Sequence, residues 1–349
     1  MAVLSDAELA KSIRQGELSP VYLLYGKETY QLQKHLSALI RKTVGKQSSC
    51  FNLQQFDGSR VTVAEIIDAA EAYPVMAEKK CVTVSSLDLE KLPEKDFNAL
   101  KELVKDPPPD TVLIFHYTGN EIDLKKSSKQ KSFLGLIEKS GTVTEFKFLS
   151  QSQLEKVLLD TAAKSGCKLS PYLACYLIDR CGDSLSVLLT EMEKLCCFVG
   201  DGEITKENVD MLTAKTVESS AFDLAKAILK REYERSFHIL SELLYQRLEP
   251  LAIMGALNMS FSDLYKAAIA KAGQIPVSTV IQDFNYKGRD FRIKNAFRDV
   301  SAVSVGQLRQ CIAILSEADL KLKSSRTDDR TIMEMVIAKM ITVKEARIR

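Results

Sequence analysis

The fold of the first part of the chain is decided by the stretch Val21-Tyr22-Leu23-Leu24-Tyr25-Gly26-Lys27-Glu28. Its first five residues form a short apolar run that a glycine ends, which is the pattern of a buried β-strand. The amphipathic stretch that follows, to about Val44, predicts a helix. The sequence therefore predicts a strand followed by a helix that covers it.

The same alternation continues through the first 150 residues. Strand patterns occupy residues 50–56, 81–84, 111–117 and 143–146, and helix patterns separate them at residues 63–72, 94–104 and 131–139. Nearly continuous apolar strands that alternate with helices are typical of a parallel sheet covered on both faces. Residues 1–148 are therefore predicted to form an α/β domain.

From residue 149 onward the periodic segments predict helices alone. They lie at residues 152–163, 171–180, 185–198, 204–211, 221–230, 233–247, 250–272, 291–300, 308–322 and 331–343. The fold class is thus α/β plus all-α. We expect three domains, which are a parallel-sheet domain over residues 1–148, a small helical domain over 149–215 and a helical bundle over 216–349.

Composition narrows the class of protein. Of the 349 residues, 46% are hydrophobic and 27% are charged, which excludes a disordered chain and a coiled-coil rod. The most apolar stretch, residues 250–261, is shorter than the roughly 20 residues of a spanning helix, and the first residues lack a signal-peptide pattern. We therefore expect a cytoplasmic protein without membrane contact.

Eight cysteines and three histidines give no metal-site pattern, because no pair of cysteines has CxxC spacing. Most of the cysteines fall in apolar periodic segments, as is typical of cysteines that pack in a core. Cys196 and Cys197 are adjacent on a predicted helix and point apart, so core packing is a better interpretation than a redox pair. We expect no metal and a reducing compartment.

Gly26 and Lys27 lie where a phosphate-binding loop would lie, directly after the first strand. The Walker A pattern would put its first glycine at position 21, which is Val21 inside the strand. Glu28 stands where a Ser or Thr hydroxyl would bind magnesium, and a carboxylate there would repel phosphate. We therefore interpret this segment as a degenerate nucleotide loop, with ATP binding as the alternative.

No other cluster of residues predicts catalysis. Asp88 and Glu90 follow the third strand and could form an acid–base or metal pair, although a solvated strand end is the simpler interpretation. His116 lies in a strand, and His35 and His238 lie on amphipathic helices without a Ser or Cys arrangement typical of a triad. The sequence predicts no catalytic residue and no cofactor.

Four segments, in their order and spacing, resemble the delta subunit family of the bacterial DNA polymerase III clamp loader. They are residues 21–28, 73–80, 221–228 and 317–323, and the resemblance extends over nearly the whole chain. It implies an AAA+-like first domain, a lid-like second domain and a collar that joins the subunits into a ring. A missing phosphate loop is a property of that family.

The resemblance also implies a clamp-binding element at Tyr73, Pro74, Val75 and Met76. Pro74 disfavours continued helix and leaves two adjacent apolar side chains at a helix end. Val-Met makes a smaller wedge than the Leu-Phe-like pair often found in the family. The alternative is that Val75 and Met76 pack into the core of their own domain.

Charge is distributed unevenly along the chain. The total is 48 Lys and Arg against 46 Asp and Glu, but residues 262–349 hold 16 against 10. That surplus of six leaves a net charge of −4 on the rest of the chain, since the whole carries +2. Basic clusters can neutralise DNA phosphates, although solvated helix faces are the alternative. The candidate DNA-proximal residues are Lys287, Arg289, Arg292, Lys294, Arg298, Lys321, Lys323 and Arg326.

The leading hypothesis is a non-catalytic subunit that binds the sliding clamp and helps to open its ring. By resemblance, its partners are ATP-binding motor subunits, a prime-type subunit and primed DNA, with the collar joining the subunits. An active AAA+-type ATPase and a general helical scaffold are the competing hypotheses.

Overall fold

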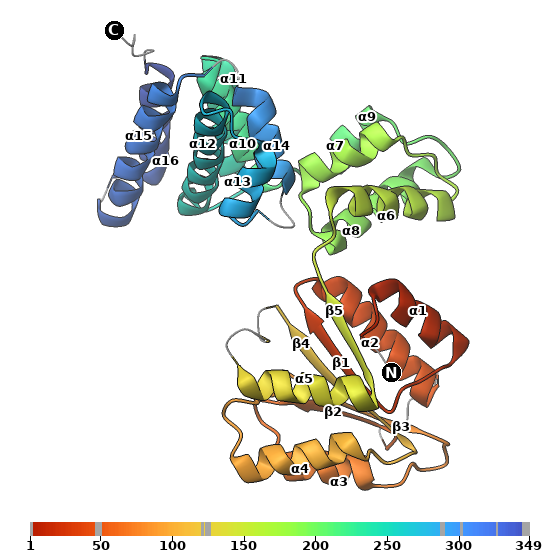
Figure 1. Cartoon of the computed structure of the whole chain (residues 1–349). Helices are drawn as coiled ribbons and strands as arrows, with labels where there is room; N and C mark the ends of the chain where they lie inside the picture. The colour runs from red at the N-terminus through yellow and green to blue at the C-terminus, as the bar shows by residue number, and fades with distance from the viewer. Residues whose placement is uncertain are drawn as a thin grey trace. The chain divides into compact units, whose positions relative to one another are not determined.

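The computed structural model describes residues 3–45, 51–119, 122, 127–286, 290–300, 303–325 and 327–343. The chain divides into two compact units, residues 1–148 and residues 149–349. Figure 1 shows a sheet with helices in the first unit and helices in the second. The division of residues 149–349 into two domains at residue 215 stays a prediction.

The first unit is built on a five-stranded parallel sheet in the order β2-β3-β4-β1-β5. Its strands are β1 (Val21–Gly26), β2 (Leu53–Asp57), β3 (Lys80–Ser85), β4 (Thr111–Thr118) and β5 (Thr142–Phe146). β1 lies between β4 and β5, with Leu23 opposite Phe115 and Val143. The predicted fold class, a parallel-sheet domain followed by helices, is confirmed.

Helices cover both faces of this sheet, as its apolar strands require. One face packs against α1 (Asp6–Gln15) and α2 (Thr29–Val44), and the other packs against α3 (Val63–Glu71), α4 (Glu94–Lys105) and α5 (Ser128–Ser140). Successive side chains of β1 pack on opposite faces of the sheet, with Leu23 on the α3–α5 side and Leu24 on the α1–α2 side. The helix α1 was not predicted from the sequence.

The second unit consists of helices in the part of residues 149–349 that the structure describes, apart from an isolated bridge between Lys168 and Glu203. The first four are α6 (Gln151–Lys164), α7 (Pro171–Cys181), α8 (Leu185–Val199) and α9 (Lys206–Leu212). The others are α10 (Val217–Leu229), α11 (Tyr233–Tyr245), α12 (Pro250–Ala272), α13 (Val277–Asp283), α14 (Asp290–Asp299), α15 (Val305–Ser324) and α16 (Asp329–Ile341). Helix α13 was not predicted from the sequence.

Two hydrophobic clusters stabilise this unit. One joins α6–α9 and the other joins α10–α16. Cys196 is buried in the first cluster while Cys197 is exposed, which confirms that the two adjacent thiols point apart. Burial raises the pKa of Cys81 and of Cys311 to about 12, so both thiols stay protonated and pack as apolar groups. None of the described helices is both long and apolar enough to cross a membrane.

Candidate functional site

The segment after α3 carries the predicted clamp-binding residues. α3 ends at Glu71, and Pro74 lacks an N–H and disfavours helical backbone at Tyr73, so the chain turns away from the helix axis. We call residues 73–76 the apolar turn. Their side chains face solvent rather than the core.

Exposure distinguishes the two interpretations of the apolar turn. Tyr73 is 85% exposed, Val75 is 50% exposed and Met76 is fully exposed, while Pro74 is half-buried. The alternative in which Val75 and Met76 fill the core of their own domain is therefore wrong. Several large apolar side chains side by side in water are unusual for a segment with no partner.

Buried polar groups fix the end of α3 beneath this turn. The Lys80 ammonium donates to the carbonyl of Ala69, and the Thr111 hydroxyl donates to that of Ala70 at 2.8 Å. These carbonyls belong to the last turn of the helix, where they have no partner within the helix and where positive charge is favourable. Burial lowers the pKa of Lys80. The first residues of β3 and β4 thus anchor the helix that carries the apolar turn.

The degenerate nucleotide loop is closed by protein groups. The backbone N–H groups of Lys27 and Glu28 both donate to the carbonyl of Phe146, at 2.8 and 3.1 Å. The Glu28 side chain is buried and accepts from the N–H of Tyr30 at 3.2 Å, at the start of α2. In a phosphate loop such amides and such a helix start would face the anion. Here the Phe146 carbonyl and the Glu28 carboxylate take the place of the anion.

Comparison with known proteins identifies the family. The family model for the delta subunit of DNA polymerase III matches residues 22–147, and the model for the C-terminal domain of the same subunit matches residues 218–340. The chain belongs to the delta-subunit family of DNA polymerase III. The resemblance seen in the sequence is thereby confirmed.

Individual relatives of this delta-family chain agree. It is 29% identical to the DNA polymerase III subunit delta of Bacillus subtilis over 96% of both chains. It is 22% identical to a probable subunit delta of Aquifex aeolicus, over 70% of this chain and 69% of that one. The solved structure of the Bacillus subtilis clamp loader delta protein covers 97% of this chain and is itself wholly covered, with a TM-score of 0.67 and 27% identity.

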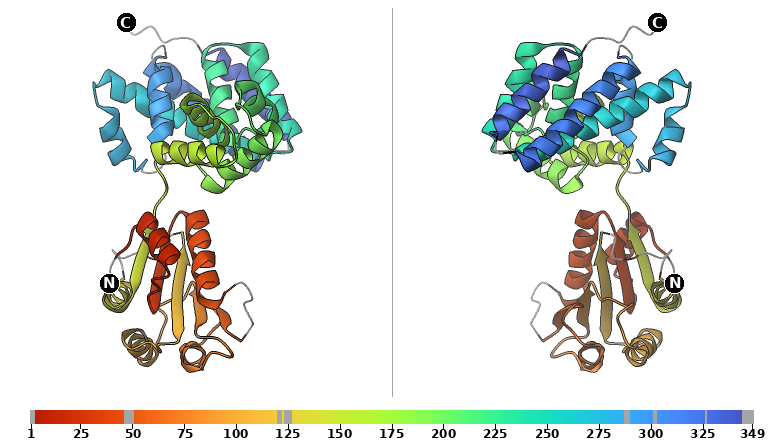
Figure 2. Two further views of the ribbon diagram at one scale, coloured as in Figure 1. Left: turned by 90° about the vertical axis from the view of Figure 1, so that its right-hand side faces the viewer. Right: turned by 90° about the vertical axis from the view of Figure 1, so that its left-hand side faces the viewer.

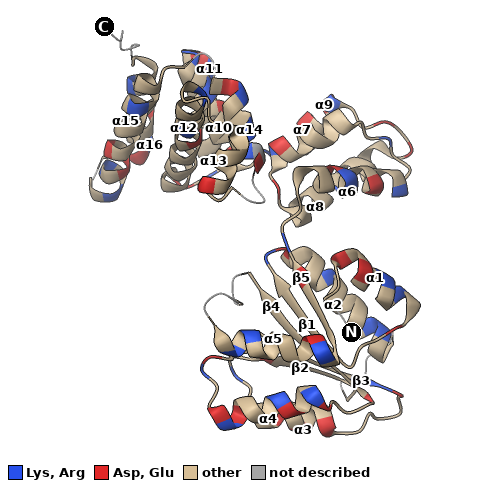
Figure 3. Ribbon diagram, in the orientation of Figure 1, with Lys and Arg blue, Asp and Glu red and all other residues tan. Residues whose placement is uncertain are grey.

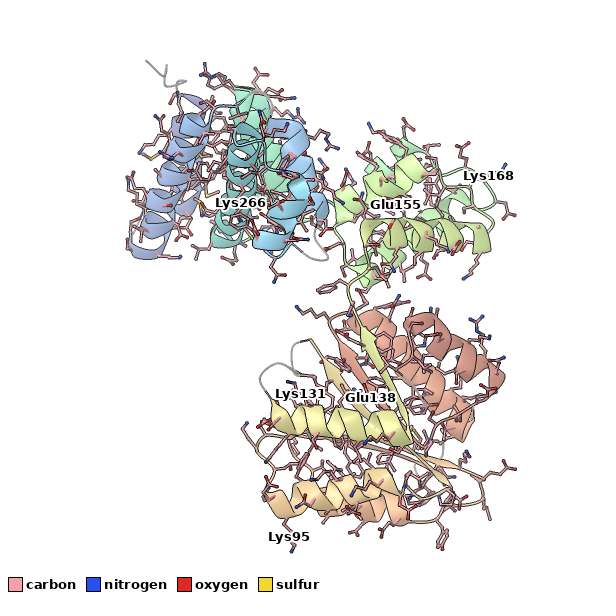
Figure 4. All side chains as sticks on the ribbon, viewed as in Figure 1. Lys95, Lys131, Glu138, Glu155, Lys168 and Lys266 are labelled. Atoms are coloured by element: carbon pink, nitrogen blue, oxygen red, sulfur yellow. The ribbon has the colours of Figure 1, made fainter. Side chains whose placement is uncertain are left out.

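The candidate DNA-proximal residues of this delta-family chain differ in their surroundings. Arg292 is largely buried and pairs with buried Asp263 at 2.7 Å, and the other oxygen of that carboxylate accepts from Tyr286. Lys266 of α12, which is labelled in Figure 4, donates to the same Tyr286 hydroxyl. Arg292 therefore belongs to a network of side chains within the second unit. Lys294 is exposed. Lys287, Arg289 and Arg326 lie outside the described residues.

The other three candidates form ion pairs on helix surfaces. Lys321 pairs with Glu317 and Lys323 pairs with Asp319, each at 2.6 Å and one helical turn apart on α15. Arg298 is exposed and pairs with the neighbouring aspartate at 3.4 Å. Figure 3 shows that both signs of charge occur along α15 and α16. The net charge of these faces is therefore smaller than their count of lysines suggests.

The carboxylates after β3 do not converge on a metal site. Asp88 pairs with Lys91 at 2.8 Å, which lowers the pKa of the Asp88 carboxyl, and Glu90 accepts from Ser127. Within the described residues no group of three or more acidic, His or Cys side chains is placed to hold a metal. This agrees with a solvated strand end.

A cavity of about 520 Å³ in the second unit was not predicted from the sequence. Side chains of α7, α10, α12 and α14 line most of it. The whole lining contains five acidic and five basic residues. Asn295 donates to Asp179 across it at 3.2 Å, and burial raises the pKa of the Asp179 carboxyl. Its balanced charge selects neither an anion nor a cation, so we assign it no ligand.

Two residues that precede β2 and lie near the apolar turn were not predicted from the sequence as part of the site. Asn52 is buried, and its side chain bonds both backbone groups of Val75. Phe51, next to it in the chain, is 66% exposed and adds a further apolar side chain at this end of the unit. Neither residue lies in a recognisable motif, and their separation from Val75 along the chain hides the contact.

Proposed function

We propose that this delta-family chain binds the sliding clamp through the apolar turn, helps to open the ring and so supports loading onto primed DNA. The observation that carries this proposal is the exposure of Val75 and Met76 on a turn anchored by buried groups. Apolar side chains that enter a partner's pocket supply most of the affinity of small interfaces. Met is flexible and suits a pocket of irregular shape.

The chain acts in this proposal as a subunit of a larger assembly. Its Bacillus subtilis relative is named a clamp loader protein, and the helices of the second unit supply a surface for neighbouring subunits. Leu320 on α15 and Met335 on α16 are more than half exposed on adjacent helices. ATP-binding motor subunits and a prime-type subunit would contact this collar, with primed DNA bound by the complex.

We propose further that the chain has no ATP site of its own. The closed loop at Lys27 and the buried Glu28 carboxylate support this, since both oppose a phosphate. We expect the isolated chain to accelerate release of its cognate clamp from circular DNA without ATP, and Lys27→Ala to have an unchanged rate. The measurement is the clamp release rate with and without ATP, beside ATP titration of both proteins. Saturable ATP binding that Lys27→Ala abolishes would favour the ATPase hypothesis instead.

DNA contact is proposed for Lys294 rather than for Arg292. In the assembled clamp loader, Lys294→Ala should make the slope of log affinity against log salt shallower by about 0.9, since one phosphate contact is lost. Lys95→Ala is the matched control, because Lys95 is exposed on α4 of the first unit (Figure 4). An unchanged slope for Lys294→Ala would mean that Lys294 does not contact the DNA.

Arg292→Met should instead lower the free energy of unfolding by about 3 kcal/mol, because Asp263 loses its charged partner.

A further inference from the structure

The backbone of the apolar turn is hydrogen-bonded to the rest of the first unit, although most of its side chains lie in solvent. Segments exposed to this degree usually exchange among conformations, because few contacts oppose their conformational entropy. Here one side chain from another part of the first unit holds the turn. It is Asn52, which lies 23 positions before Val75 in the chain.

The Asn52 amide binds Val75 as a neighbouring strand would. Its Nδ2 donates to the Val75 carbonyl at 2.8 Å, and its Oδ1 accepts from the Val75 N–H at 2.7 Å. Because one end of the amide donates and the other accepts, both bonds form in a single orientation. Asn52 is 7% exposed, so its polar groups depend on these bonds.

The sheet in turn fixes Asn52. Its backbone carbonyl accepts from the N–H of Cys81 at 2.8 Å, and the next residue, Leu53, pairs with Cys81 in the β2–β3 ladder. The amide therefore extends from the rigid end of β2 to the middle of the apolar turn. The sheet fixes the position of Asn52, and the two hydrogen bonds of the Asn52 amide fix the backbone of Val75.

Met76 follows the held residue in an unfavourable conformation. Its φ is +52°, in the left-handed region that residues other than glycine rarely adopt. Such a conformation persists only where the surrounding structure imposes it. With Val75 held on both of its backbone groups, the chain bends at Met76, and the Met76 side chain is fully exposed.

We propose that Asn52 is a positioning residue that preforms the apolar turn for the sliding clamp. This rests on the proposed function of the turn. A turn that is already ordered loses less entropy on binding than a flexible one, so preformation increases affinity without an added contact. Asn52 acts through Val75 and Met76 rather than by touching the clamp, since its own side chain is buried.

The test measures clamp binding by the whole chain without nucleotide. We expect Asn52→Ala to raise the dissociation constant by about tenfold, because the clamp must then order the turn. Asn52→Asp should do at least as much, since it loses the donor and places a charged oxygen opposite the Val75 carbonyl. Asn295→Ala is the matched control, because it removes an asparagine hydrogen bond to Asp179 in the second unit, and it should leave the dissociation constant unchanged.

Two further readouts separate positioning from a loss of stability. Hydrogen exchange should quicken at the Val75 amide in Asn52→Ala and stay slow in β3. In a background that carries both Val75→Ala and Met76→Ala, Asn52→Ala should weaken binding by less than about twofold, since the two side chains that it positions are gone. Equal weakening in both backgrounds, or an unchanged dissociation constant in the parent, would overturn the proposal. If Asn52→Ala does not fold, Asn52→Asp is measured in the same two backgrounds.

The two proposals fail in different ways. If Val75→Ala and Met76→Ala leave clamp binding intact, then the apolar turn is not the clamp contact and the proposed function is wrong. If those variants weaken binding while both Asn52 variants bind as the parent does, then only the role of Asn52 is wrong.

Discussion

Replacing Val75 and Met76 together by alanine is expected to raise the dissociation constant for the sliding clamp by about a hundredfold. Both side chains are exposed in the free chain, so they are available for burial in a partner. Truncation of an apolar anchor that a partner fully buries costs about 1.5 kcal/mol, and two such losses multiply to two decades of affinity. The measurement is a clamp titration by calorimetry without nucleotide.

The control for this variant has the same chemistry at another place. Val187 on α8 and Met211 on α9 are also exposed, and Val187→Ala with Met211→Ala removes the same atoms from the second unit. We expect parental affinity for that control, and thermal unfolding of both variants near that of the parent, because neither pair is part of a core. If the two double variants lost affinity equally, the apolar turn would have no special part in binding.

Most of the sheet could be predicted from sequence because its three inner strands, β3, β4 and β1, are buried on both faces. Two of these strands can be recognised without tertiary information, at residues 21–25 and 111–117. Each is a nearly continuous apolar run, which is typical of a strand buried on both faces. Helix α1 was missed although it has a capping box, in which Ser5 and Glu8 bond each other's backbone N–H groups. It buries only two side chains, so its apolar periodicity is weak. The seven-residue helix α13 is too short for a periodic pattern.

The location of the apolar turn could be predicted because residues 73–80 resemble the delta-subunit family, and Pro74 also marks the helix end there. Its support could not, because the bonds from Asn52 to Val75 and from Thr111 to Ala70 depend on which strands become neighbours. Ion pairing could not be predicted from the sequence either. Arg292 was grouped with DNA-proximal residues by its position in a basic run, whereas in the structure its partly buried side chain pairs with buried Asp263.

Gly26→Ala is expected to lower the free energy of unfolding of the first unit by about 4 kcal/mol, among the largest effects of a single substitution. Gly26 has a φ of +142°, in the region that favours glycine, and an added Cβ would lie 2.1 Å from the carbonyl oxygen of Phe146. That oxygen is held by the N–H groups of Lys27 and Glu28, so it cannot move away without loss of both bonds. The measurement is urea unfolding of the whole chain by circular dichroism, with hydrogen exchange in β1 assigning the loss to this unit.

This result would separate two explanations for a glycine and a lysine where a phosphate loop would lie. If they served a nucleotide, Gly26→Ala and Lys27→Ala would both weaken ATP binding. Because we place Gly26 in the approach of β1 to β5, we expect only Gly26→Ala to be destabilising and Lys27→Ala to stay near the parent. Gly45→Ala is the control for backbone strain alone, since no atom lies within 4 Å of an added Cβ. Its φ of +77° and ψ of −171° are essentially confined to glycine, so this substitution should cost about 2 kcal/mol. If Gly26→Ala and Gly45→Ala lowered the free energy of unfolding equally, the Phe146 carbonyl of β5 would have moved away from the added Cβ. The close approach of β1 to β5 would then not explain why glycine occupies position 26.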